Sequence, residues 1–456
     1  MSATIDVDRL IDEQKIGRFN VMIVAWSFLA MLADGYEITA MAFAAPELVR
    51  VWGVETSSLG PVFSASLFGV LFGAPLLGWV GDRYGRRVAI ILACVICGVA
   101  TLSMVATTNL QQMFALRFIA GIGIGGLMPN TISLTSELSP KKFRAMLIVL
   151  MFTGITLGSG SPSVIAATLV PQYGWQVLFL IGGVFPLAVA ACLVFYLPES
   201  IKFLAVRKLR PEKLLQTARR ARPDLVIPAT AEFVVRRAEA GGTAGLGIRQ
   251  IFAGGLAWIT PLLWFCFAAT LMANFFLNSW MPVLFERSGM DPEQAALASG
   301  LYHVGGTLGG LLISVLIDRY GVLVIAVFLA LAGPVVAAIG LAGLPQAALL
   351  ALSLGAGVCV LGAQFGNNAS AGMIYPTEVR AKAVGWAFSI GRFGSILGPI
   401  VGGVLIAQDS SLASMLLVAA APLVLGALAA MQLTRLCHRR YGGLRLDDQP
   451  VQDGVA

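Results

Sequence analysis

The chain has 456 residues, of which 57% are hydrophobic and only 12% are charged. An average soluble domain has roughly 25% charged residues, so this composition excludes an ordinary soluble protein and predicts an α-helical membrane protein. The net charge of +7 is explained by the orientation in the membrane derived below, and no nucleic acid is expected as a partner.

Apolar stretches recur along the whole chain, and each is long enough to cross a hydrocarbon core of about 30 Å as a helix. Residues 1–18 mix acids and bases, and the apolar run after them is longer than a signal-peptide core, so we expect an uncleaved N-terminus. Hydropathy predicts twelve spans, near residues 20–44, 57–80, 88–107, 112–135, 145–169, 175–197, 256–284, 295–316, 322–342, 347–372, 382–406 and 412–433.

Lysine and arginine are distributed unequally between the two sides that these spans define. With the N-terminus inside, external loops hold only Arg50 and Arg287, while Arg117 and Arg392 fall inside spans. Every other Lys and Arg lies in a segment predicted to be cytoplasmic. The positive-inside rule therefore predicts a multi-pass protein of the bacterial inner membrane with both termini in the cytoplasm.

One long polar stretch follows the sixth span and divides the chain into six plus six helices. The predicted domains are a cytoplasmic N-tail (1–19), an N-terminal six-helix bundle (20–197), a cytoplasmic basic linker (198–255), a C-terminal six-helix bundle (256–433) and a cytoplasmic C-tail (434–456).

The two halves are related by an internal repeat with a constant shift of 236 residues. This shift carries Asp82-Arg83-Tyr84-Gly85 onto Asp318-Arg319-Tyr320-Gly321, Arg144-Ala145 onto Arg380-Ala381, and Gly158 onto Gly394. Transporters built from paired halves place their substrate site near the midplane, between the repeats. The repeat therefore favours a transporter over a channel or a structural membrane protein.

Three segments carry a resemblance to a known family. The run Gly78-Trp-Val-Gly-Asp82-Arg83-Tyr-Gly85-Arg86-Arg87 resembles the loop 2–3 signature of the major facilitator superfamily. Arg117-Phe-Ile-Ala-Gly121-Ile-Gly123-Ile-Gly125 is similar to its fourth-helix motif, and Gly154, Gly158 and Pro162 to its fifth helix.

Within that superfamily, the chain resembles the aromatic acid:proton symporters. The segments that carry this resemblance are Asp34-Gly35-Tyr36-Glu37, Met128-Pro129-Asn130 with Ser136-Glu137, Tyr375-Pro376-Thr377-Glu378-Val379-Arg380-Ala381, and Gly391-Arg392-Phe393-Gly394.

The resemblance implies an all-α membrane protein with twelve transmembrane helices in two pseudo-symmetric six-helix bundles. It also implies proton-coupled import of a small aromatic carboxylate, such as 4-hydroxybenzoate, protocatechuate or benzoate, by alternating access. A symporter of a non-aromatic acid such as a muconate-like dicarboxylate, a uniporter or exporter of the same fold, and a transport-inactive membrane sensor are the alternatives. Glu37 stands where the family usually has Asp, which moves the charge by about one methylene.

Ionisable side chains inside the spans are the candidate site, because each costs roughly 2.5–3.5 kcal/mol at the bilayer centre. Asp34 and Glu37 share one helical face, and two close carboxylates favour proton uptake near neutral pH, so both are predicted to couple protons. Arg117 lies at a similar depth, and its predicted partner is Asp34, Glu37 or the substrate carboxylate. Two roles are open for Arg117. It exchanges one of these anions for another during transport, or it forms a fixed structural ion pair.

A substrate site needs a cation for the carboxylate, a flat apolar slot and polar contacts. Arg392 in the eleventh span is the second candidate for the carboxylate, with an interhelical hydrogen bond as its alternative role. The predicted contacts are Tyr36, Asn274 and Asn367, with Phe275, Phe276, Gln364 and Asn368 as further candidates; simple packing is the alternative for each.

Charges at the inner ends of the spans are assigned to gating, namely Asp82, Arg83, Arg86, Arg87, Glu137 and Asp318. By family resemblance, Asp82 is expected to face the positive N-terminus of span 11 in one access state. His303 inside span 8 is a possible proton relay, and a neutral hydrogen-bonded histidine is the alternative.

No convincing nucleophile, phosphate loop or metal-ligand set is present, so we expect no enzymatic activity, no metal and no cofactor. The glycines of span 4 lie within a membrane helix without a preceding strand, which argues against a dinucleotide loop. Five of the six cysteines lie in apolar runs, where packing is the simplest role. The expected partners are a small organic acid, protons and the lipid bilayer, for a protein that functions as a monomer.

Overall fold

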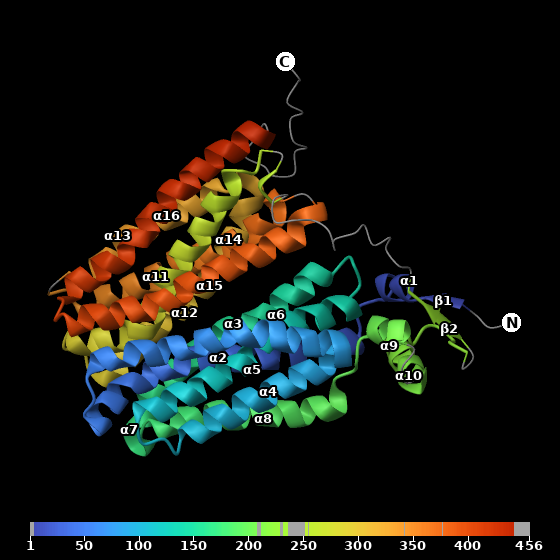
Figure 1. Cartoon of the computed structure of the whole chain (residues 1–456), viewed down its shortest axis with the longest axis horizontal. Helices are drawn as coiled ribbons and strands as arrows, with labels where there is room; N and C mark the ends of the chain where they lie inside the picture. Colours follow the sequence, from blue (N-terminus) through green and yellow to red (C-terminus); the bar gives the residue numbers. More distant parts are fainter. Residues whose placement is uncertain are drawn as a thin grey trace. The chain divides into compact units, whose positions relative to one another are not determined.

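The computed structural model describes residues 4–207, 211–228, 231–235, 251–253, 255–341, 343–375 and 377–441 (Figure 1). Pro376, most of the second half of the predicted linker and the end of the predicted C-tail lie outside these residues. Within them, twelve helices are long and apolar: α2 (Arg18–Trp52), α3 (Leu59–Tyr84), α4 (Arg86–Met104), α5 (Leu110–Leu138), α6 (Arg144–Thr168), α8 (Gln176–Tyr196), α11 (Ile259–Arg287), α12 (Pro292–Tyr320), α13 (Leu323–Ile339), α14 (Gln346–Ile374), α15 (Thr377–Ala407) and α16 (Leu412–Tyr441).

These helices confirm the predicted all-α membrane fold. Eleven of those in the described residues are long and apolar enough to cross a membrane. The twelfth, α13, has 17 residues, which is at the lower end of the range for a spanning helix. Several helices extend past the hydropathic span; α2, for example, continues through Pro46 to Trp52.

Two compact units make up the described chain. Unit 1 comprises Met1–Ile38, Phe68–Ser159 and Gln176–Gly241, and unit 2 comprises Thr39–Leu67, Gly160–Trp175 and Gly242–Ala456. Unit 2 thus holds α11–α16 together with the last part of α2, the first part of α3 and the end of α6. The bundle boundaries predicted from the sequence describe repeated segments rather than compact units, and they stay a prediction.

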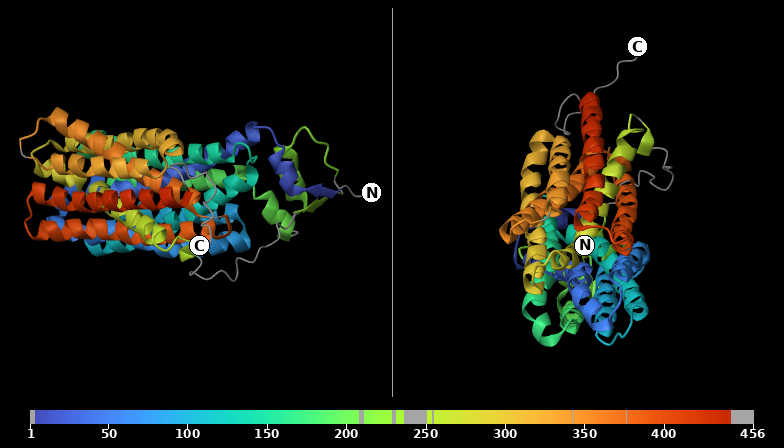
Figure 2. Two further views of the ribbon diagram at one scale, coloured as in Figure 1. Left: turned by 90° about the horizontal axis from the view of Figure 1, so that it is seen from above. Right: turned by 90° about the vertical axis from the view of Figure 1, so that its left-hand side faces the viewer.

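The tail and the first part of the linker pack together at one end of unit 1. Strand β1 (Thr4–Asp6) pairs in parallel with β2 (Glu232–Val234). Helices α1 (Val7–Asp12), α9 (Ile201–Arg207) and α10 (Pro211–Ala221) lie beside this pair, beyond the ends of the long helices of the unit (Figures 1 and 2). Lys202 of α9 forms an ion pair with Asp8 of α1. The short helix α7 (Val170–Tyr173) and the 3-10 helix Thr56–Ser58 belong to unit 2.

Helix packing within each unit reproduces the internal repeat in detail. A Cβ atom added to Gly158 of α6 would lie 2.1 Å from the carbonyl oxygen of Leu32 in α2. The corresponding atom on Gly394 of α15 would lie 2.1 Å from the carbonyl oxygen of Ala268 in α11. Both members of the second contact are shifted by 236 residues from the first, so the same close approach occurs in both halves.

The contact between the second and fourth spans of each half repeats in the same way. Gly73 of α3 approaches the carbonyl oxygen of Ile122 in α5, and Gly309 of α12 approaches that of Val358 in α14, each at 2.1 Å from an added Cβ atom. Gly69 with Phe118 and Gly305 with Leu354 give a further matching pair. Small residues let helix backbones approach closely where lipid supplies no hydrophobic driving force between helices.

Substituting the packing glycines should therefore destabilise the two units in parallel. We expect Gly158→Ala and Gly394→Ala each to lose about 1–3 kcal/mol, because the methyl group would overlap a backbone carbonyl. The matched controls are Gly78→Ala in α3 and Gly385→Ala in α15, where an added Cβ meets nothing within 4 Å. These should be neutral or gain up to about 1 kcal/mol from helix propensity. Thermal unfolding in detergent measures the difference, and equal shifts in all four variants would contradict the packing argument.

Candidate functional site

An ion pair between α2 and α5 is buried within unit 1. Arg117 Nη1 donates to Glu37 Oε1 at 2.9 Å and to the Glu37 carbonyl oxygen at 3.1 Å. The side chains are only 2% and 1% exposed. A guanidinium is always charged in a protein, so burial of this kind requires a carboxylate in contact. Of the three partners that the sequence allowed for Arg117, the structure places Glu37 at this contact.

Asp34 lies one turn before Glu37 on the same helix and is also buried. Asp34 is 4% exposed and Glu37 is 1% exposed. Asp34 thus lies one helical turn from the ion pair of Glu37 and Arg117, and the proton-coupling roles of both acids stay predictions. This cluster of two carboxyl groups and one guanidinium is buried between α2 and α5.

The cluster is positioned because the segment Asp34–Glu37 contacts several helices at once. An added Cβ atom on Gly35 would lie 2.0 Å from the Ile155 carbonyl oxygen of α6, so only glycine allows this approach. Tyr36 donates through its hydroxyl to the Leu178 carbonyl oxygen of α8 at 2.8 Å and is 4% exposed. Consecutive residues thus reach α6, α8 and α5. The predicted contact of Tyr36 with substrate stays a prediction, and its hydrogen bond holds α2 against α8.

Unit 2 contains a polar cluster between α11, α12 and α14. Asn274 accepts a hydrogen bond from the Tyr302 hydroxyl at 2.7 Å, and Asn367 Nδ2 donates to Thr270 Oγ1 at 3.1 Å. The sequence singled out Asn274 and Asn367 but missed Tyr302 and Thr270. The four-residue spacing of Thr270 and Asn274 on one helical face was the available signal. His303 is buried beside the Tyr302 ring, and its role as a relay stays a prediction.

Three buried amide oxygens in unit 2 have no hydrogen-bond donor within the part of the chain that the structure describes. They are Asn278 Oδ1 of α11, and Gln364 Oε1 and Asn367 Oδ1 of α14. Arg392 of α15 belongs to the same unit and is half-buried. A buried acceptor without a donor costs about 1–3 kcal/mol, so these atoms are suited to a ligand that brings its own O–H group.

Three of the six predicted gating residues contact one another around the loop between α3 and α4. Arg86 pairs with Asp82, and its Nε lies 3.6 Å from Glu137 Oε1 of α5. Glu137 also accepts a hydrogen bond from the Ser200 hydroxyl, just after α8. The structure thus brings Asp82, Arg86 and Glu137 into one network inside unit 1.

Glu199 belongs to the same network through Ser200, and no role was predicted for it from the sequence. Its Oε1 accepts from the backbone N–H groups of Arg87 at 3.2 Å and Ser200 at 3.0 Å. Gly85 has φ 110°, and a Cβ atom there would lie 2.0 Å from Glu199 Oε2. Burial raises the pKa of the Glu199 carboxyl, while these backbone donors lower it. The carboxylate therefore lies at the N-terminus of α4 in the place that a side chain at position 85 would occupy.

The second copy of the loop keeps the turn. Gly321 also has a positive φ of 55°. Arg83 lies over the rings of Trp79 and Tyr84, at 5.9 and 5.8 Å, and Arg319 lies over the Tyr320 ring at 5.4 Å. Asp318 is exposed. Its gating role and that of Arg83 and Arg87 stay predictions.

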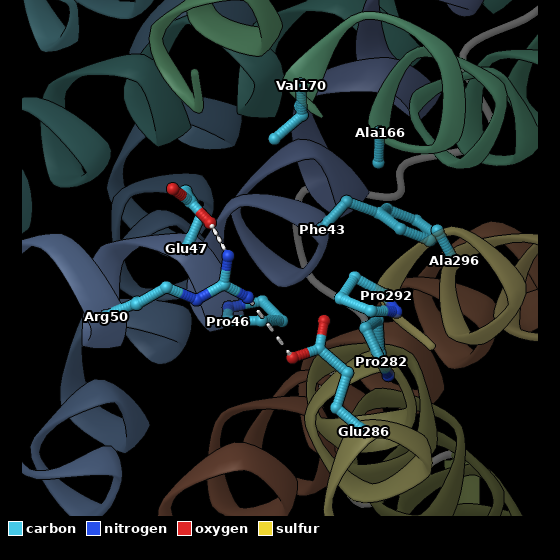
Figure 3. A pocket seen from close by; sticks show the side chains of 10 residues that line it. All are labelled: Phe43, Pro46, Glu47, Arg50, Ala166, Val170, Pro282, Glu286, Pro292 and Ala296. Atoms are coloured by element: carbon cyan, nitrogen blue, oxygen red, sulfur yellow. Dashed lines mark ion pairs between the residues drawn. The ribbon is translucent and has the colours of Figure 1, made fainter. Parts of the chain in front are cut away.

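A small pocket in unit 2 contains an ion triad that the sequence did not predict (Figure 3). Arg50 at the end of α2 lies between Glu47, at 2.7 Å, and Glu286 of α11, at 4.0 Å. The three-residue spacing of Glu47 and Arg50 was a signal for the first contact, but the second joins residues far apart in sequence. This triad ties the end of α2 to the end of α11.

The described residues contain no group of three or more His, Cys, Asp or Glu side chains that could hold a metal ion. None of the six cysteines forms a disulfide.

Comparisons with known proteins support the family resemblance and the all-helical membrane fold. The family model of the Major Facilitator Superfamily matches residues 27–369 and 263–442. The 4-hydroxybenzoate transporter PcaK of Pseudomonas putida is 37% identical, over 88% of this chain and 90% of the relative. The gallate transporter of Pseudomonas putida is 33% identical, over 94% and 95%. A crystal structure of a bacterial homolog to the human lysosomal transporter Spinster, in an inward-facing and occupied conformation, has a TM-score of 0.70 at 16% identity, over 92% and 98%, which shows the same fold.

Breaking the buried ion pair should cost far more than breaking an exposed one. We expect Glu37→Gln, or Arg117→Met, to destabilise the protein by about 3–5 kcal/mol, because each leaves one buried charge uncompensated. The double variant should recover part of this loss. Glu47→Gln is the control, because its partner Arg50 is 59% exposed, and should cost at most about 1 kcal/mol. Thermal unfolding of the purified variants measures these differences, and a double variant as unstable as the sum of the single ones would refute the coupling.

Proposed function

This chain belongs to the major facilitator superfamily, and from that premise we propose that it imports a small aromatic carboxylate together with protons by alternating access. The first candidate substrate is 4-hydroxybenzoate. The names of its relatives, transporters of 4-hydroxybenzoate and of gallate, support transport rather than an enzymatic function. The proposed location is the bacterial inner membrane with both termini in the cytoplasm, and the proposed functional unit is a monomer.

The observation that carries the proton coupling is the buried pair of Glu37 and Arg117, with Asp34 one turn away. Arg117 stays charged throughout the cycle, so it must contact an anion whenever it is buried. If Glu37 takes up a proton, the arriving substrate carboxylate replaces it as that anion. Substrate binding and proton binding then favour each other, which is the requirement for symport.

A second set of proposed substrate contacts lies in unit 2. Arg392 holds a carboxylate by the same charge-assisted geometry in a second stage of the cycle. The amide oxygens of Asn278, Gln364 and Asn367 accept hydrogen bonds from phenolic O–H groups, because they lack donors among the described residues. Both 4-hydroxybenzoate and gallate carry such hydroxyl groups on the ring, so this chemistry supports a hydroxylated aromatic acid.

The network of Asp82, Arg86 and Glu137 is proposed as the cytoplasmic gate of unit 1. Its charged contacts are made by residues at helix ends, which can exchange partners without unfolding a helix. The second copy around Asp318 has no matching arginines after it and is proposed to hold less strongly.

Uptake of radiolabelled 4-hydroxybenzoate and benzoate into cells that express the protein tests the function. We expect uptake that is abolished by a protonophore and by Asp34→Asn, because without the nearby Asp34 charge the cluster no longer favours proton uptake by Glu37. The matched control is Asp291→Asn, an exposed acid whose side chain forms no cap hydrogen bond. Membrane insertion of each variant is measured in the same cells.

Two results would count against this proposal. Uptake that is unaffected by the protonophore would exclude proton coupling while leaving transport intact. Failure to take up either compound, by protein shown to be in the membrane, would exclude both as substrates and direct the search to non-aromatic carboxylates.

Preference for a ring hydroxyl should depend on the buried amide oxygens. We expect Gln364→Leu and Asn278→Leu to raise the KM for 4-hydroxybenzoate about tenfold or more while changing that for benzoate little, because only the former donates to these oxygens. Gln346→Leu, at the exposed start of α14, is the control. Equal losses for both substrates would show that the amides support packing instead of selecting the hydroxyl.

A further inference from the structure

A cavity of about 460 Å³ lies in unit 1 where α4 begins and α8 ends. Helices α9 and α10 lie beside these helix ends and contribute to its wall (Figure 1). Its volume is within the range of about 300–1,000 Å³ that is common for small-molecule sites. Arg83 and Arg87, which have predicted gating roles, line this cavity, while Asp82, Arg86 and Glu137 of the proposed gate do not.

The wall of the cavity is strongly basic. Four cationic side chains line it, from Arg83, Arg87, Lys213 and Arg220, against one carboxylate, from Glu199. That carboxylate already accepts hydrogen bonds from two backbone N–H groups, that of Arg87 at the start of α4 and that of Ser200 after α8. The cations therefore outnumber the available negative charge, and the cavity attracts an anion.

Helix α10 presents its basic face to this cavity. Lys213, Gln216 and Arg220 recur at intervals of three and four residues and are exposed, while Leu214 and Ala218 between them are buried. Neither Lys213 nor Arg220 has an acidic partner within 4 Å among the described side chains. From the opposite wall, Arg87 donates through Nη2 to the Val194 carbonyl oxygen, and its buried Nε has no acceptor in the described ranges.

Beside the basic wall lies an apolar rim. Phe195 is 79% exposed, Tyr84 and Tyr196 are each 55% exposed, and Val88 is 44% exposed. These residues are at the ends of membrane helices, where aromatic side chains favour the region of the lipid headgroups. A ligand with a phosphate group and acyl chains matches both features, because its charge would enter the cavity while its chains follow Phe195 and Val88.

We propose that this cavity binds the phosphodiester headgroup of an anionic phospholipid, with Arg87, Lys213 and Arg220 as its ligands. The headgroup bridges the start of α4 and the basic face of α10. It thereby holds the helices of the linker against the end of unit 1. The proposal is independent of the transported substrate.

Titration of the purified full-length protein with lipid, followed by native mass spectrometry, tests this site. We expect saturable binding of phosphatidylglycerol, at least tenfold tighter than that of phosphatidylcholine with the same acyl chains. Lys213→Gln/Arg220→Gln should weaken it about thirtyfold, because each cation near a membrane surface contributes about a factor of five. The matched control, Lys141→Gln/Lys142→Gln, removes two exposed cations that do not line the cavity and should change the affinity less than twofold.

Inorganic phosphate and a photoreactive phosphatidylglycerol distinguish the possible sources of the phosphate group. Phosphate alone should compete only weakly, and the lipid probe should crosslink at the end of α8, near Phe195. Competition by phosphate as tight as binding of the lipid would overturn the lipid assignment. Equal losses in both double variants, or crosslinks spread evenly over the surface, would overturn the site and indicate general attraction by surface charge. Thermal unfolding of the variants confirms that each is folded.

Discussion

The ion pair of Glu37 and Arg117 is the constraint on which the arrangement of unit 1 depends. Both side chains are almost completely removed from solvent, and neither charge could be held in lipid alone. The pair therefore fixes the rotation of α2 about its axis and the depth of α5 beside it. Once α2 is rotated in this way, Gly35 must face α6 and Tyr36 must face α8. A single electrostatic contact thus determines which residues of the first span contact each neighbour.

The repeat duplicates the helix packing but not the charges. Gly158 and Gly394 make the same backbone contact in their own halves. The shift of 236 residues, however, carries Glu37 onto Ala273 and Arg117 onto Ser353, and Asp34 onto Thr270. The second half therefore has a neutral, hydrogen-bonded interior at the positions where the first half has its ionic cluster. This division matches the proposed roles, in which the first half exchanges protons and the amides and Arg392 of the second half contact the substrate.

The sequence predicted those features that depend on composition and spacing. Hydropathy gave the spans, and the shared face of Asp34 and Glu37 gave the acidic cluster, because a helical repeat determines which side chains are neighbours. Contacts between distant helices were not predictable in this way. Whether Tyr36 lines a cavity or donates a hydrogen bond to Leu178 depends on which helix packs beside it. The hydropathy profile is the same in both cases, so it cannot distinguish them. The pairing of β1 with β2 was missed for a related reason, since strands of three residues carry almost no periodic signal.

The proposed exchange at Arg117 also keeps the buried charge constant. Before substrate arrives, Asp34 and Glu37 are anionic and Arg117 is cationic, which leaves one net negative charge. After Glu37 takes up a proton and a substrate carboxylate replaces it, the cluster again carries one net negative charge. Because the desolvation penalty of the cluster then changes little between the two states, the cycle avoids a high electrostatic barrier. An uncompensated carboxylate would add a second net charge to the same buried volume, so in the proposed cycle the anion enters together with the proton.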